Sequence, residues 1–154
     1  MKCQLVHAYK DRLDYLFDQA SEFSDNPELL AHWANYLCVL VSGFVEVAMR
    51  EIYYQYAKGR TDPSILNFVK RQLASVNNPK MKKVKEVTAW FSPDWAKQLE
   101  SQLSDEHVAA LNSIMDNRHN IAHGRSSDIS YIELKKWYSR IIQLVDEIES
   151  LCGI

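Results

Sequence analysis

Residues 27–59, PELLAHWANYLCVLVSGFVEVAMREIYYQYAKG, form a long stretch with a single pattern. Their apolar side chains recur every three or four positions, which is the period of an α-helix. At 1.5 Å per residue this helix is about 45 Å long, enough to be the spine of a helical bundle. The apolar stripe is wide, so we expect the helix to pack on more than one side. Its main row is Leu30, Trp33, Leu37, Val41, Phe44, Ala48, Ile52 and Tyr56.

The same period recurs on both sides of this stretch, between breaks that contain proline or helix-capping residues. Only four glycines and four prolines interrupt 154 residues, and no strand-like alternation of useful length occurs. We therefore predict an all-α bundle of long antiparallel helices, folded as one domain over residues 1–154. The predicted helices cover about 3–23, 63–76, 80–102 with a break near Ser92-Pro93, 104–123 and 131–151. Tryptophans at helical spacing or near breaks are expected in the core rather than as base-stacking platforms; they are Trp33, Trp90, Trp95 and Trp137.

Composition predicts a cytoplasmic globular protein. The chain is 47% hydrophobic and 25% charged, and its apolar runs are too interrupted to suggest a membrane span. The charged N-terminus lacks the apolar region of a signal peptide. Three distant cysteines without a CxxC pair suit reduced thiols better than disulfides or a zinc site.

The net charge of −2 conceals a basic segment at residues 58–85. This segment holds eight lysines and arginines and a single acid, Asp62, which leaves the rest of the chain with 10 basic and 19 acidic residues. Such a segment can attract phosphate groups, or it can be a solvated lysine face.

Residues 116–124, DNRHNIAHG, concentrate the polar chemistry of the chain. On a helix His119 and His123 share a face, whereas Arg118 and His123 are about 140° apart around the axis. Gly124 predicts a left-handed helix end. Arg118 and His123 could converge through a change of direction at that end, or across the axis of a dimer.

These residue types suit metal-free RNA cleavage. A guanidinium is a planar fork of donors for phosphate, and a histidine can take or give a proton near neutral pH. Attack by the ribose 2′-OH would yield a 2′,3′-cyclic phosphate. The rival interpretations are a zinc site on His119 and His123 with Asp116 as third ligand, although the HExxH glutamate is absent, and a helix end with only a structural role. We expect no metal and no cofactor.

The sequence N-R-x-x-I-A-H-G, residues 117–124, resembles the signature of HEPN domains, in particular the RiboL-PSP-HEPN branch. Two further elements are similar in kind and order: residues 41–46 with Arg50 following, and Phe-Ser-x-x-Trp at 91–95. The resemblance covers nearly the whole chain. It implies an all-α homodimer in which two R-x4-H elements face one cleft. Many members are metal-independent endoribonucleases of toxin–antitoxin, anti-phage or RNA-processing systems.

The resemblance implies Arg118 as the group that stabilises the phosphate and transition state, and His123 as general acid and base. The family often has asparagine directly after the arginine; here His119 stands there and Asn120 follows, so either could support the site. Asn117 is a further supporting candidate. Glu46 and Arg50 either support the cleft or form a structural ion pair, since they are four residues apart on a helix.

The partners implied are RNA, a second copy of the chain and a cognate antitoxin or other partner protein, without a membrane. The alternative is a non-catalytic HEPN-like module that dimerises and binds a partner protein or a nucleotide.

Overall fold

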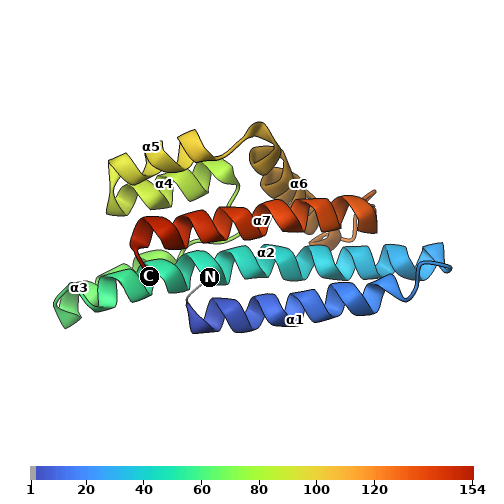
Figure 1. The fold of residues 1–154 in the computed structure, drawn as a ribbon, viewed down its shortest axis with the longest axis horizontal. Coiled ribbons are helices and arrows are strands. Elements are labelled where there is room, and N and C mark those ends of the chain that lie inside the picture. Colours follow the sequence, from blue (N-terminus) through green and yellow to red (C-terminus); the bar gives the residue numbers. More distant parts are fainter. Residues whose placement is uncertain (1–2) are drawn as a thin grey trace.

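The computed structural model describes residues 3–154 and places seven α-helices and no strand in them (Figure 1). The all-α prediction is confirmed, and the predicted helix between residues 80 and 102 is divided at Ser92. The helices are α1 (Gln4–Ser21), α2 (Pro27–Lys58), α3 (Pro63–Ala74), α4 (Met81–Phe91), α5 (Pro93–Gln102), α6 (Asp105–Ala122) and α7 (Tyr131–Cys152).

Three helices begin with the same local device. A polar side chain just before the helix accepts a hydrogen bond from a backbone N–H of the first turn, and a proline occupies the first helical position. Proline fits there because that N–H has no partner inside the helix. The capping side chains are Asn26 for α2, Asp62 for α3 and Ser92 for α5.

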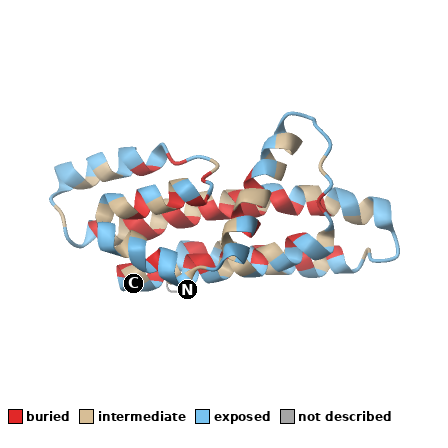
Figure 2. Ribbon diagram, turned by 90° about the horizontal axis from the view of Figure 1, so that it is seen from above, coloured by how far each residue is buried: buried red, intermediate tan, exposed pale blue. Residues whose placement is uncertain are grey.

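Helix α2 is the centre of the bundle. It packs against α1, α3, α6 and α7, and it lies between α1 and α7 in the elongated body (Figure 1). Helices α1 and α2 are antiparallel, whereas α7 runs in the same direction as α2 because α3 to α6 carry the chain back. Figure 2 shows the buried residues concentrated along the long helices, with the exposed ones on their outer faces.

Helix α2 is long and apolar enough to cross a bilayer, and it is the one helix within residues 3–154 that is. The interrupted apolar runs of the sequence had indicated no membrane span. Its fully buried residues include Leu37, Phe44 and Ile52, which belong to the hydrophobic core. Burial by neighbouring helices accounts for this composition, since a helix packed on several sides is apolar around much of its circumference.

The tryptophan prediction holds for three side chains and is wrong for the fourth. Trp33, Trp95 and Trp137 pack against the core, but 43% of Trp90 is exposed. The aromatic position of α4 that faces inward is Phe91, whose ring stacks on Tyr53 at a centroid distance of 4.6 Å. Consecutive helical residues point 100° apart, so the packing of Phe91 against the core turns Trp90 towards solvent.

Candidate active site

The end of α6 is a Schellman motif. The N–H of Gly124 donates to the carbonyl of Ile121 at 3.1 Å, and the N–H of Arg125 donates to that of Asn120 at 2.9 Å. This closure requires a left-handed residue, and Gly124 has a φ of +65°. The predicted helix stop at Gly124 is therefore confirmed. These two hydrogen bonds fix the backbone that carries the candidate side chains.

His119 and His123 lie together on one face of this helix end. Their ring centroids are 4.5 Å apart with the planes tilted by 59°, and both residues are exposed. His123 keeps this contact although it is the capping residue, with φ −97° and ψ 13°. The predicted shared face is confirmed, and the end of the helix does not turn His123 away from it.

Arg118 is held through its backbone, and its side chain is half-buried. Its backbone N–H lies against the thiol of Cys38 on α2, which also donates to the carbonyl of Ile114 at 3.5 Å. Burial raises the pKa of the Cys38 thiol to about 12, so this contact involves a neutral thiol. Within residues 3–154 the Arg118 guanidinium has no hydrogen-bond or ion-pair partner. An unpaired guanidinium is available to an anionic ligand.

Asn117 connects the motif to the loop that follows it. Its side-chain amide donates to the carbonyl of Ser113 at 2.9 Å, and its oxygen accepts from the hydroxyl of Ser127 at 2.8 Å. With both ends occupied, Asn117 holds the loop against α6. Asn120 contributes its backbone carbonyl to the helix end, and its side chain is half-buried.

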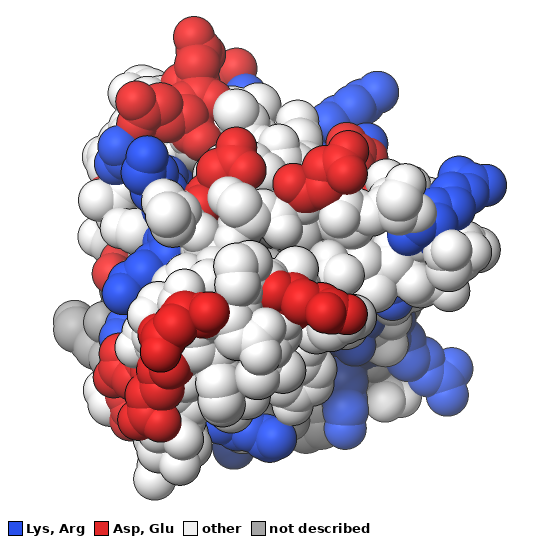
Figure 3. All heavy atoms as spheres, turned by 90° about the vertical axis from the view of Figure 1, so that its right-hand side faces the viewer, with Lys and Arg blue, Asp and Glu red and all other residues white. Residues whose placement is uncertain are grey.

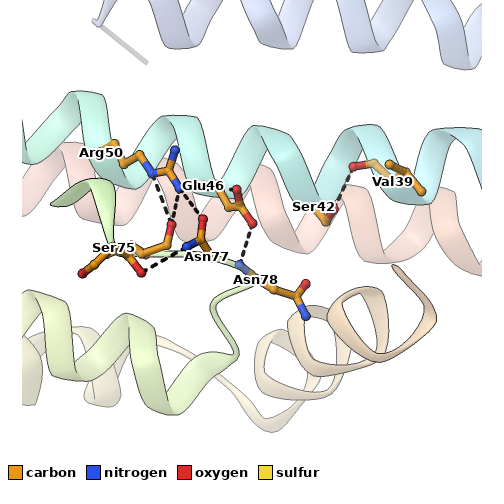
Figure 4. A network of polar contacts seen from close by, with 8 residues as sticks. Val39, Ser42, Glu46, Arg50, Ser75, Asn77 and Asn78 are labelled. Atoms are coloured by element: carbon orange, nitrogen blue, oxygen red, sulfur yellow. Dashed lines mark hydrogen bonds and ion pairs between the residues drawn. The ribbon is translucent and has the colours of Figure 1, made fainter. Parts of the chain in front are cut away.

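Glu46 and Arg50 hold the α3–α4 loop, residues 75–80, against α2 (Figure 4). Glu46 accepts from the backbone N–H of Asn78 at 2.5 Å, while Arg50 donates to the carbonyl of Val76 and to the Asn77 side chain. The two charged groups also form an ion pair at 3.6 Å. The sequence left two roles open for Glu46 and Arg50, support of the cleft or a structural ion pair. Their contacts are those of a structural ion pair that also holds the loop.

The α3–α4 loop then contacts α6 one turn before Arg118. The Asn78 side chain donates to the carbonyl of Met115 at 3.4 Å, and Lys80 forms an ion pair with Asp116 at 2.6 Å. From the sequence, residues 77–79 are only part of the break between the helices predicted at 63–76 and 80–102, and this connection was not predicted. A left-handed Asn78, with φ 45°, was its one local indication.

Asp116 does not join the histidines in a metal site. Its carboxylate is held by Lys80, and within residues 3–154 no group of three or more His, Cys, Asp or Glu side chains is arranged to hold a metal ion.

Figure 3 views the end of the molecule where α7 begins. Acidic groups form separate clusters across this end and basic groups lie around its margin, so no continuous basic stripe covers it.

An all-α bundle with an R-x4-H element at the closed end of a helix places the chain in the HEPN class of domains. More narrowly, it belongs to the RiboL-PSP-HEPN family, whose sequence model matches residues 7–153. Searches of curated proteins and of solved structures gave no significant match.

Proposed function

We propose that the protein is a metal-independent endoribonuclease in which Arg118 and His123 act on RNA. The observation that carries this proposal is the hydrogen-bonded end of α6, which carries two exposed histidine rings in contact and, on another side of the helix, an arginine side chain that has no partner within residues 3–154. A fixed backbone suits catalysis because the groups need little reorganisation as charge develops.

The reaction is a transesterification. A histidine takes the proton of the ribose 2′-OH, and the 2′-oxygen forms a bond to the adjacent phosphorus while the bond from phosphorus to the 5′-oxygen breaks. The leaving 5′-oxygen receives a proton, and the products are a 2′,3′-cyclic phosphate and a 5′-hydroxyl end. Arg118 would bind the nonbridging oxygens, where negative charge grows. His119, in contact with His123, would assist the proton transfers.

We further propose a homodimer that uses Arg118 of one copy with His123 of the other. The five-residue spacing separates the two side chains by about 140° on one helix. His123 stays on the face of His119, so the helix end does not turn it towards Arg118, which supports a site shared between two chains. A two-fold axis near the motif would bring the two faces together.

We place this activity in the cytoplasm, in a toxin–antitoxin, anti-phage or RNA-processing system with a cognate antitoxin or other partner protein. A non-catalytic module that dimerises and binds a partner protein or a nucleotide is the second candidate. The net charge of −2 and the acidic clusters in Figure 3 favour it, because neither attracts RNA.

RNA cleavage in EDTA separates the two. The wild type should cleave in EDTA and form cyclic phosphate ends, and Arg118→Ala and His123→Ala should each lose activity. Equal activity in all three proteins, or loss of activity in EDTA, would refute the proposal of a metal-independent nuclease that uses Arg118 and His123.

Mixing the two inactive variants tests the shared site. If subunits exchange at random, about half of the dimers are mixed and each has one complete site of two, so about a quarter of the activity should return. A mixture that stays inactive after exchange would place both groups of a site in one chain.

A further inference from the structure

An apolar pocket of about 500 Å³ lies between the C-terminal part of α2, α3 and α4, away from the R-x4-H element. Aromatic side chains form much of its wall, together with Val69 and Leu73 and with the polar groups of Thr61 and Gln72. Its volume lies within the range of ligand pockets, roughly 300–1,000 Å³. The aromatic members are Tyr56, Phe68, Trp90 and Phe91.

Two of these aromatic rings face solvent. Phe68 is 62% exposed and Trp90 is 43% exposed. Exposure of two large rings at one pocket is unfavourable for the isolated chain, and such patches mark binding sites. Phe68 is also absent from the side chains that form the core or pack against it.

Cations accompany these rings. The Lys83 ammonium lies 4.8 Å from the centre of the Trp90 ring, and the Arg60 guanidinium lies 4.3 Å from the centre of the Tyr56 ring. Arg71 is one turn from Phe68 on α3 and therefore lies near the same face. Lys83 is also paired with Glu86 at 2.7 Å, which reduces its contribution.

The surrounding segment keeps most of its positive charge. Of the eight basic residues between 58 and 85, three form ion pairs with acids: Lys80, Lys83 and Lys85. The other five have no acidic partner within residues 3–154: Lys58, Arg60, Lys70, Arg71 and Lys82. The single acid of the segment, Asp62, is engaged in capping α3.

We propose that this pocket binds an unpaired base of single-stranded RNA, with Phe68 and Trp90 as stacking surfaces and the basic residues facing the phosphates. Aromatic platforms flanked by positive charge are the physical requirements for binding single strands. An acidic protein segment would match the charge but would not need two flat exposed rings. The proposal rests on the proposed function for its choice of RNA.

The pocket is connected to the R-x4-H element through α2 and the α3–α4 loop. Tyr56 at the pocket is ten residues along α2 from Glu46, which is a distance of about 15 Å. Glu46 holds the loop that contacts α6 beside the motif.

Binding is best measured with an RNA that cannot be cleaved. A fluorescein-labelled single-stranded oligonucleotide with 2′-O-methyl riboses lacks the attacking hydroxyl, and fluorescence anisotropy gives its Kd. We expect Phe68→Ala and Trp90→Ala to weaken binding about 5- to 100-fold each. The same oligonucleotide in a duplex has no free bases and should be insensitive to both changes.

The matched controls are Ile65→Ala on α3 and Ile132→Ala on α7, because both side chains are exposed and neither lines the pocket. Both should bind as the wild type does. Equal affinity of Phe68→Ala, Trp90→Ala and the controls would overturn the proposal and favour a protein occupant. That result would leave the nuclease proposal intact, since cleavage in EDTA tests it separately.

Discussion

A single methyl group at Gly124 should reduce both stability and activity. The φ of this residue is +65°, and a Cβ built on it would meet no atom within 4 Å. The cost of Gly124→Ala therefore comes from the backbone alone, and we expect the free energy of unfolding to fall by about 1–2 kcal/mol. For a chain of this size, each kcal/mol corresponds to a fall in Tm of roughly 2–4 °C.

The chain offers two controls of opposite kind. Gly153 closes α7 with the same hydrogen-bond pattern, has a φ of +66° and is equally open, so Gly153→Ala should cost a similar amount. Gly59 caps α2 with a φ of −87° and is open too. Alanine adopts that conformation readily, so Gly59→Ala should be neutral or stabilising by up to about 1 kcal/mol.

Urea unfolding followed by circular dichroism measures the stability, and RNA cleavage per folded molecule measures the site. Gly124→Ala should lower cleavage because His123 and Arg125 flank the strained residue, whereas Gly153→Ala should leave cleavage unchanged. Gly124→Asn should recover part of both losses, since asparagine tolerates the left-handed region. If Gly124→Ala is as stable as Gly59→Ala, residue 124 does not adopt the left-handed conformation in solution. If Gly124→Ala and Gly153→Ala cleave RNA equally well, the left-handed helix end at Gly124 is not required by the proposed site.

Three further predictions concern single side chains. Glu46→Ala should lower the free energy of unfolding by about 1–3 kcal/mol in urea denaturation because the Asn78 N–H loses its acceptor, and Glu46→Gln should cost less; a folded Glu46→Gln without RNA cleavage would contradict the structural role. Arg118→Lys should reduce cleavage about 10²- to 10³-fold at unchanged Tm, because lysine lacks the planar fork; full activity would rule out a paired contact to phosphate. The pKa of Cys38 rises from 9.0 to about 12, so the native state keeps a proton that the unfolded state loses, and the free energy of unfolding should fall as pH rises from 9.0 towards about 12. Urea denaturation at a series of pH values checks this, and an equally steep fall in Cys38→Ala would assign the effect to other groups.

Helix boundaries were predictable because their determinants are local. Asn26-Pro27, Asp62-Pro63 and Ser92-Pro93 each combine a capping acceptor with a proline that fits the first turn. The left-handed end at Gly124 follows from the same kind of short-range rule. These features depend on residues within one turn, so the sequence alone contains the information.

The roles of Glu46 and Trp90 were not predictable in this way. Glu46 accepts from Asn78, which is 32 residues later, and Asn78 donates to Met115, another 37 residues on. Trp90 and Phe91 are both large aromatic residues, and only the position of α2 decides which of them packs against the core. Such outcomes depend on how helices pack, which a helical period does not specify.

The spacing of Arg118 and His123 combines both kinds of information. Local geometry predicts that they point to different sides of α6, and the contact between His119 and His123 agrees with it. A site confined to one chain would more simply place its arginine and histidine three or four residues apart, where helical neighbours meet. A spacing of five is understandable if each side chain faces a different copy of the helix. In that case the geometry of the site depends on how two copies of the chain pack together, and neither the sequence nor the fold of one chain specifies that packing.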